Sequence, residues 1–279
     1  MQKRIIYITF LFAISIAFGC MPKSNKSTTP AYIVTSPEVA EIIVLLGAED
    51  NIVGVTTECD YPNILQSKTK VGTFSEISYE KVVELSPTIV FASNLEQQKL
   101  ASDLKKMGIR TEIIYSQSLN DMFDNISKIG ELIGKSERAK LVVDSLQTEL
   151  KKITDTAELY NNKKVYIEIY GDPIMTVSDN SFVGNLVEIA GANNIFDSLP
   201  RDYSMVSAEK VIESAPEIMI LTYPGMSKSD IKNRKGWSNI PAIKNGKIFT
   251  IEDINPDLIL RATPRAILGM KKLQEIYND

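Results

Sequence analysis

Residues 78–90, Ser-Tyr-Glu-Lys-Val-Val-Glu-Leu-Ser-Pro-Thr-Ile-Val, decide how the chain is organised, because a closely similar stretch follows 129 residues later. The second copy, residues 207–219, reads Ser-Ala-Glu-Lys-Val-Ile-Glu-Ser-Ala-Pro-Glu-Ile-Met, and seven of the thirteen positions are identical. Upstream of each copy lies a second matching pair, residues 46–52 and 190–195. Two ordered matches in each half of the chain predict two lobes of similar build.

Each copy has the signals of a helix that leads into a buried strand. Ser78 and Ser207 are favourable N-cap residues, and Glu80 and Glu209 follow in the first turn, where a negative charge suits the helix dipole. A proline ends each predicted helix, and an apolar run follows at 89–92 and at 218–221. Strands and helices that alternate along both halves predict an α/β fold with two similar Rossmann-like lobes and mostly parallel sheets.

A long helical segment separates the two halves. Apolar residues recur at helical spacing from Met122 to Ile133, Gly134 marks a break, and the periodicity resumes over 136–156. The second helix would be roughly 30 Å long at 1.5 Å per residue. We expect it to be a rigid strut that joins the lobes and leaves a ligand cleft between them. The alternative is a helix packed wholly on the first lobe.

The second half also predicts a loop at 170–173 and an irregular polar stretch at 228–239 that is anchored by Trp237. The predicted boundaries are therefore an N-terminal lobe over 31–119, a helical linker over 120–160 and a C-terminal lobe over 161–279.

Composition excludes several classes of function. The net charge is −4 and no run of five basic residues occurs, so we expect no nucleic-acid partner. The chain contains no histidine, which rules out a Ser-His-Asp triad and imidazole-bound zinc. An enzyme built on a carboxylate pair would need its two acids within ~10 Å, whereas Glu80 and Glu209 are expected in different lobes. We expect no enzyme activity, no cofactor and no resident metal.

The first thirty residues have the features of an export and anchoring segment. Lys3 and Arg4 precede an apolar run of fourteen residues, 5–18, which is too short for a comfortable membrane span. Small residues then precede Cys20, as in a bacterial lipobox. We therefore expect a lipoprotein signal peptide over 1–19, lipidation of Cys20, and a flexible tether over 20–30 that holds the protein outside the cytoplasm on a membrane. The alternative is an ordinary signal peptide that is cleaved nearby.

Candidate binding residues follow the predicted strands, where open α/β sheets bind their ligands. Aromatic residues are frequent in these loops and include Tyr61, Phe74, Tyr170 and Tyr203. Each alone is explained by packing, but together they favour a flat, large, partly apolar ligand. The thiol of Cys59 could bind a soft metal, although a small buried residue in a turn is the simpler interpretation.

Several stretches carry a resemblance to a known family: residues 46–48 with 53–56, Cys-Asp-Tyr-Pro at 59–62, 71–74, Ile-Glu-Ile-Tyr at 167–170 with Asp-Pro at 172–173, 190–196, 237–242, and Thr-Pro-Arg at 263–265. Over residues 32–277 the chain resembles the class III, helical-backbone, substrate-binding proteins of ABC importers, most of all the vitamin B12 (cobalamin)-binding branch. The resemblance implies an extracytoplasmic binding protein, expected to be a monomer, that captures cobalamin or a related corrinoid and delivers it to a permease.

The resemblance also implies roles for individual residues. Glu80 and Glu209 would dock on a permease dimer, since a two-fold partner offers two equivalent basic patches. Positions that match family ligand contacts are Tyr61, Phe74, Tyr203, Asp253 and Arg261, to which the strand-end position adds Tyr170. The family often has tryptophan where this chain has Phe74 and Tyr203. Haem or an iron-siderophore remains the alternative ligand, and a lipid-anchored enzyme is the more distant one.

Overall fold

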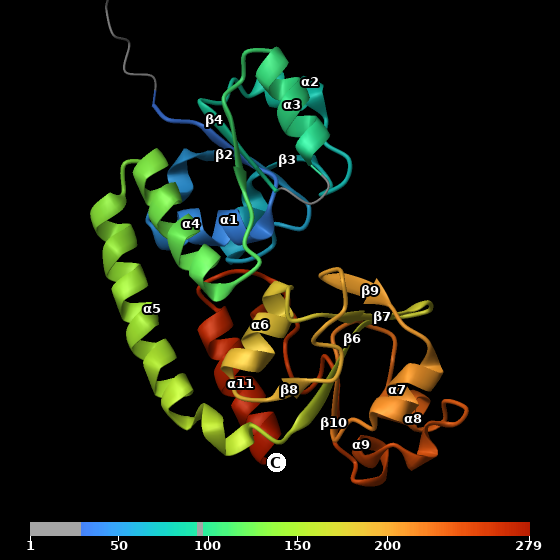
Figure 1. The fold of residues 1–279 in the computed structure, drawn as a ribbon. Helices are drawn as coiled ribbons and strands as arrows, with labels where there is room; N and C mark the ends of the chain where they lie inside the picture. The colour runs from blue at the N-terminus through green and yellow to red at the C-terminus, as the bar shows by residue number, and fades with distance from the viewer. Residues whose placement is uncertain (1–28, 94–96) are drawn as a thin grey trace, which may run out of the picture.

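Two open β-sheets, one in each half of the chain, form the framework of the protein (Figure 1). The computed structural model describes residues 29–93 and 97–279. The predicted signal peptide, Cys20 and most of the predicted tether lie outside the described residues. No helix in the described part of the chain is long and apolar enough to cross a membrane.

Sheet A belongs to the first lobe and is parallel throughout. Its strands are β1 (Tyr32–Val34), β2 (Ile52–Thr56), β3 (Thr69–Gly72), β4 (Ile89–Ser93) and β5 (Thr111–Ile114), in the order β3-β2-β1-β4-β5. Helices α1 (Pro37–Leu45), α2 (Tyr79–Glu84) and α3 (Gln98–Lys106) connect them, with short 3-10 helices at Glu49–Asn51 and Asn63–Ser67. The strand order reverses between β1 and β4, and open sheets of this kind bind ligands at such a point.

Sheet B belongs to the second lobe and is mixed. It has the order β11-β10-β6-β7-β9, with β8 beside β6; β11, β10, β6 and β8 are parallel, whereas β7 and β9 are antiparallel. The strands are β6 (Lys164–Gly171), β7 (Ile174–Val177), β8 (Asn193–Asn194), β9 (Tyr203–Met205), β10 (Ile218–Leu221) and β11 (Ile248–Phe249). The predicted loop at 170–173 is thus the tight turn of a hairpin. Strands β7 and β9 were not predicted, because strands of three or four residues are too short to show a period.

The remaining helices of the second lobe are mostly short. They are α6 (Phe182–Ile189), α7 (Ala208–Ser214), α8 (Lys228–Lys232), α9 (Pro241–Lys244), α10 (Asp257–Leu260) and α11 (Ala266–Asn278), with a 3-10 helix at Trp237–Asn239. The prediction that 228–239 is irregular was therefore wrong, because a capping box between Ser227 and Asp230 starts α8. Trp237 is an anchor as predicted, with 1% of its surface exposed.

The two copies of the repeated stretch adopt the same local structure. Ser78 caps α2 and Ser207 caps α7, each by accepting a hydrogen bond from the backbone N–H three residues later. In each copy the residue just before the proline lies in the left-handed region, Ser86 at φ 44° and Ala215 at φ 50°. These are the only described non-glycine residues with positive φ, and they are equivalent positions of the repeat. The repeat is therefore a repeat of structure as well as of sequence.

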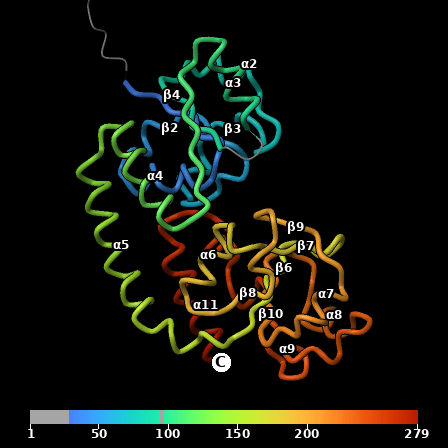
Figure 2. Tube along the Cα trace, in the orientation of Figure 1, coloured from blue at the N-terminus to red at the C-terminus, as the bar shows by residue number. Residues whose placement is uncertain are grey.

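Two helices connect the lobes, α4 (Leu119–Leu132) and α5 (Ser136–Ala157). The 22 residues of α5 make it roughly 33 Å long. It packs on α4 beside the first lobe and on α6 and α11 of the second, so it spans both as predicted (Figure 1). The C-terminal chain reaches the boundary between the lobes before α11 runs back beside α5 (Figure 2). One hydrophobic core continues from Val34 in β1 through Ile153 in α5 to Leu273 in α11.

Candidate functional site

Helix α1 presents one face to the second lobe. Glu38, Glu41 and Leu45 are spaced i, i+3 and i+7, which places them in a line along the helix that is roughly 10 Å long. Pro37 occupies the first helical position and fixes where this line begins. Glu38 therefore lies at the end of α1 near the carboxyl edge of sheet A, and Leu45 lies at the end near the strut. The three positions have different partners.

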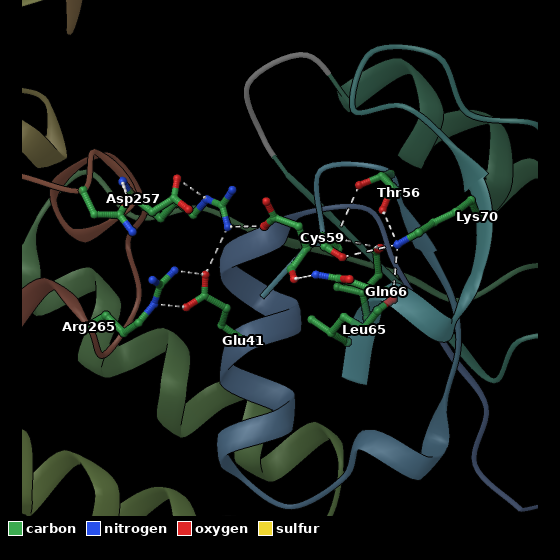
Figure 3. Close-up of polar contacts among 12 residues, drawn as sticks. Glu41, Thr56, Cys59, Leu65, Gln66, Lys70, Asp257 and Arg265 are labelled. Carbon is green, nitrogen blue, oxygen red and sulfur yellow. Dashed lines mark hydrogen bonds and ion pairs between the residues drawn. The ribbon is translucent and has the colours of Figure 1, made fainter. Parts of the chain in front are cut away.

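The central position, Glu41, is an ion-pair site that joins the lobes. Its side chain is buried and receives hydrogen bonds from Arg265, Nε to Oε2 at 2.7 Å and Nη2 to Oε1 at 2.6 Å (Figure 3). Arg261 adds a weaker contact to Glu41 at 3.4 Å. Paired arginine–carboxylate bonds of this kind are directional as well as strong, so they fix the second lobe against α1.

Arg261 also pairs with two other acids. It contacts Asp60 of the first lobe at 2.9 Å and Asp257, one turn earlier on its own helix, at 3.1 Å. The guanidinium of Arg261 therefore pairs with three carboxylates, and that of Arg265 pairs with one. The cations at this boundary are already paired with protein acids.

The strut end of α1 borders an apolar cavity of about 380 Å³. Tyr61 stands in its wall, with the guanidinium of Arg265 4.0 Å above the ring centre. Helices α1, α5 and α11 contribute Glu41, Leu45, Leu146, Ile267, Leu268 and Lys271, and Pro62 and Pro264 complete the lining. Tyr61 is thus brought next to Arg261 and Arg265, but it faces the cavity on the strut side.

The opposite end of α1 lies near a second set of contacts between the lobes. Asp202, just before β9, accepts hydrogen bonds from Tyr115 Oη at 3.1 Å and Gln117 Nε2 at 2.9 Å, both of which follow β5 in the first lobe. Tyr203 is the next residue and is half-buried. Tyr203 therefore lies next to a residue that is hydrogen-bonded to the first lobe, just beyond the end of β5.

Electrostatic effects show that Glu38 belongs to the same group. Burial raises the pKa of Tyr203 to about 12, and the charges of Asp202 and Glu38 add to this increase. Burial also raises the pKa of Tyr115, to which the hydrogen bond with Asp202 and the charge of Glu38 contribute. The pKa of Glu38 itself is raised by burial, against the smaller opposing effects of its own backbone N–H, of Ser36 and of the charge of Arg261. Glu38, Tyr115, Asp202 and Tyr203 are called the interlobe cluster below.

Gln97 organises the carboxyl ends of β1 and β4. Its side-chain oxygen accepts hydrogen bonds from Thr35 Oγ1 at 2.6 Å and Ser93 N at 2.9 Å, and its amide donates to the Phe74 carbonyl at 2.8 Å. Phe74, a predicted ligand residue, is therefore fixed at this edge by its backbone. The buried hydroxyls of Ser36 and Ser93 lie at the same edge without a hydrogen-bond partner among the described residues.

The two remaining predicted ligand residues lie elsewhere in the second lobe. Tyr170 ends β6, is half exposed, and packs its ring 6.2 Å from that of Tyr223. Tyr223 is fixed in turn by the buried carboxylate of Glu168, which also holds Arg234 through two bonds of 2.7 Å. The carboxylate of Asp253 is paired with Lys228 at 2.9 Å and accepts from Thr250 N at 2.8 Å. Among the described residues, no hydrogen bond or ion pair joins Tyr170 or Asp253 to the interlobe cluster.

Cys59 is fully buried, with Sγ 3.4 Å from Thr56 Oγ1. Burial raises its pKa to about 11, which keeps the thiol protonated and supports the structural interpretation.

Glu80 and Glu209 are both exposed, in the first turns of α2 and α7. These helices lie far apart, on the side of the molecule away from α5 (Figure 1). The pKa of Glu209 is lowered by its own backbone N–H and then by Ser207.

Glu38, Glu41, Tyr115 and Asp202 were not predicted as site residues, although the spacing of Glu38, Glu41 and Leu45 along one helix face was visible in the sequence. Nothing local marked Tyr115 and Asp202, which are 87 residues apart and meet only in the folded chain.

Comparison with known proteins places the chain in a family. Residues 33–255 match the family described as periplasmic binding protein, and the chain belongs to it. It is 31% identical over 270 residues to an uncharacterised ABC transporter substrate-binding lipoprotein, YvrC, of Bacillus subtilis, covering 92% of this chain and 84% of that one. It is 24% identical to a vitamin B12-binding protein of Vibrio vulnificus, covering 99% and 97%. It is also 24% identical to the high-affinity heme uptake system protein IsdE of Staphylococcus aureus, covering 91% of each.

A solved structure agrees with the family. A possible iron-binding, periplasmic solute-binding protein from Staphylococcus epidermidis superposes with a TM-score of 0.78 at 29% identity, covering 89% of this chain and 98% of that chain. The α/β fold with a long helix between two lobes, predicted from the sequence, is confirmed. The protein is the substrate-binding component of an ABC importer, an extracytoplasmic transport protein and not an enzyme.

Proposed function

We propose that this protein captures cobalamin or a related corrinoid between its lobes and delivers it to an ABC permease. The observation that carries the proposal is the interlobe cluster, in which Tyr115 of the first lobe donates a hydrogen bond to Asp202, the residue before Tyr203, at the strand ends where α/β proteins bind ligands. Tyr203 would stack on the macrocycle, and Phe74 and Tyr170 would border it. A vitamin B12-binding protein that is similar over nearly its whole length supports the same ligand class.

The delivery step rests on the two exposed acids. Glu80 and Glu209 would meet equivalent basic patches on a two-fold permease dimer, since they occupy equivalent positions of the repeat on distant helices. Lipidation of Cys20 would hold the protein, as a monomer, at the membrane where the permease lies.

Titration of the protein with cyanocobalamin, followed by intrinsic fluorescence, tests the proposal. Tyr203→Ala should weaken binding at least ~10-fold, because it removes a stacking ring and its buried area. Tyr79→Ala, which removes an exposed tyrosine from α2, is the control and should bind as the unmodified protein does. Equal affinities for the two variants would exclude Tyr203 from the site.

Haem is the second candidate, because a heme uptake protein is among the relatives. With no histidine in the chain, an axial iron ligand would have to be a tyrosine phenolate or a sulfur. The raised pKa of Tyr203 and Tyr115 opposes phenolate formation. Tyr203→Phe separates the candidates, since it keeps an aromatic ring for a corrinoid but removes the oxygen that iron needs. If haem shifts the absorbance spectrum with the unmodified protein but not with Tyr203→Phe, haem is the favoured ligand.

A further inference from the structure

Strand β6 carries an acid in the interior of the second lobe. Tyr166, Glu168 and Tyr170 alternate along the strand and lie on one face of sheet B, which Tyr223 shares just after β10. Tyr166 and Glu168 are fully buried, whereas Tyr170 is half exposed at the carboxyl end of β6. Glu168 therefore lies between a ring of the core and a ring that a ligand can reach.

The carboxylate of Glu168 holds side chains from three segments of the lobe. Tyr166 Oη donates to Oε2 at 2.9 Å, and Arg234 donates to both carboxylate oxygens at 2.7 Å. Tyr223 Oη donates to Oε1 and accepts a further hydrogen bond from Arg234 Nη2 at 3.1 Å. Paired arginine–carboxylate bonds are directional, and a buried network of this kind allows its members few alternative positions.

The network presses on the hairpin that carries Tyr170. A Cβ added at Gly171 would collide with Tyr223 Oη and lie 3.2 Å from Arg234 Nη2, so the glycine makes room for both side chains. The rings of Tyr170 and Tyr223 lie 6.2 Å apart, at an angle of 47° to each other. The position of Tyr170 is therefore tied to side chains that Glu168 holds.

We infer that Glu168 is a positioning residue for ligand binding, which acts through Tyr223 and Arg234 to preset the ring pair of Tyr170 and Tyr223 at the carboxyl end of β6. The inference rests on the proposed function, in which Tyr170 borders the macrocycle. Rings that are already fixed lose less conformational freedom when a ligand binds, which raises affinity. Glu168 is fully buried, so it acts on the ligand only through these neighbours.

Two variants that each remove one phenol hydroxyl from Glu168, and keep the ring, test the inference. Tyr223→Phe frees the ring beside Tyr170 and should weaken the binding of cyanocobalamin ~5-fold, measured by calorimetric titration. Tyr166→Phe is the matched control, because it removes the donor on the core side. It should change the affinity less than ~2-fold.

A positioning role requires that the effect pass through Tyr170. In the background of Tyr170→Ala, the further change Tyr223→Phe should therefore alter the affinity less than ~2-fold, whereas a merely structural loss would persist there. Tyr170→Ala by itself should weaken binding, because it removes a ring of the pair.

Trp237, the single tryptophan of the chain, gives a readout that needs no ligand. Its buried ring lies 4.5 Å from the guanidinium of Arg234 and 6.4 Å from the ring of Tyr166. Glu168→Gln leaves Arg234 without its charged partner, so it should shift the emission of Trp237 and weaken cyanocobalamin binding ~10-fold. If this variant does not fold, the two phenylalanine variants decide the question.

The outcomes separate the positioning role from the proposed function. If cyanocobalamin binds, equal affinities of Tyr223→Phe and Tyr166→Phe would show that Glu168 does not position the ligand residues, and the proposed function would stand. The same holds if Tyr170→Ala binds as tightly as the unmodified protein, or if the loss from Tyr223→Phe persists without the Tyr170 ring. If haem binds and cyanocobalamin does not, the proposed function is wrong, and the same variants titrated with haem decide the positioning role. Binding of neither contradicts both.

Discussion

Arg265 in the second lobe and Glu41 in the first are joined by two hydrogen bonds of 2.6 and 2.7 Å, and the glutamate is almost fully buried. Removing one partner of a buried ion pair leaves the other charge without compensation, which costs about 3–5 kcal/mol. Arg261 offers Glu41 only a longer contact at 3.4 Å. Arg265→Ala should therefore lower the free energy of unfolding by roughly 3 kcal/mol in urea denaturation. The control is Arg110→Ala, which breaks an exposed ion pair with Glu112 and should cost less than ~0.5 kcal/mol. Equal losses of stability in the two variants would show that the Arg265–Glu41 pair does not hold the lobes together.

Gly191 packs closely against the C-terminal end of the strut. A Cβ placed there would lie 2.0 Å from the carbonyl oxygen of Ala157, the last residue of α5, and its φ of 103° is left-handed. Gly191→Ala should destabilise the protein by roughly 3 kcal/mol or more, because the backbone must shift to make room for the methyl group and because alanine is strained at this positive φ. Gly47→Ala at the matching position has φ 73° and nothing within 4 Å, so it should cost only ~1 kcal/mol. Thermal unfolding measures the loss of stability in each variant. Equal losses for Gly47→Ala and Gly191→Ala would show that the contact with Ala157 is not the cause.

Glu38→Gln should make the protein more stable at neutral pH. The folded-state pKa of Glu38 is raised above its ordinary value of 4.5, so ionisation of this residue opposes folding. The destabilisation sets in as the pH rises through 4.5 and is complete above the folded-state pKa. Melting curves should therefore show a higher midpoint for the variant at pH 7, and no difference below about pH 4, where both states of the unmodified protein are protonated. A higher melting midpoint of the variant that persists below about pH 4 would show that ionisation of Glu38 is not the cause.

Reversing both docking acids should abolish uptake without affecting ligand binding. Glu80→Lys/Glu209→Lys would place cations against the basic patches expected on the permease, and like charges at an interface cost several kcal/mol. The control is Glu84→Lys/Glu213→Lys, which makes the same charge change one turn further along the same helices. Uptake of labelled cobalamin by cells with each variant as their only copy is the measurement. Equal uptake by the two double variants would show that Glu80 and Glu209 do not dock.

The framework was predictable because its signals are local and strong. The repeat, the helix caps at Ser78 and Ser207, and the apolar period of 122–153 all act over a few turns of chain. The left-handed residues Ser86 and Ala215 confirm how closely the two copies agree. Strands β7 and β9 escaped notice because their pairing is antiparallel and short, and depends on tertiary contacts that no local pattern records.

The candidate site was predicted only in part. Tyr203 and Arg261 were chosen from the sequence and do lie at the lobe boundary, but Tyr61 faces the strut side and Asp253 is occupied by Lys228. Glu38 and Asp202 were not predicted because no local pattern marks them. Asp202 meets Tyr115, 87 residues away, only in the folded chain.

The two halves remain alike in the outward-facing helices α2 and α7, whereas their sheets have diverged: the second half turns its central strand back through a hairpin and the first does not. A partner with two-fold symmetry would therefore find equivalent features on the outside of the molecule, while the region between the lobes suits a ligand without symmetry.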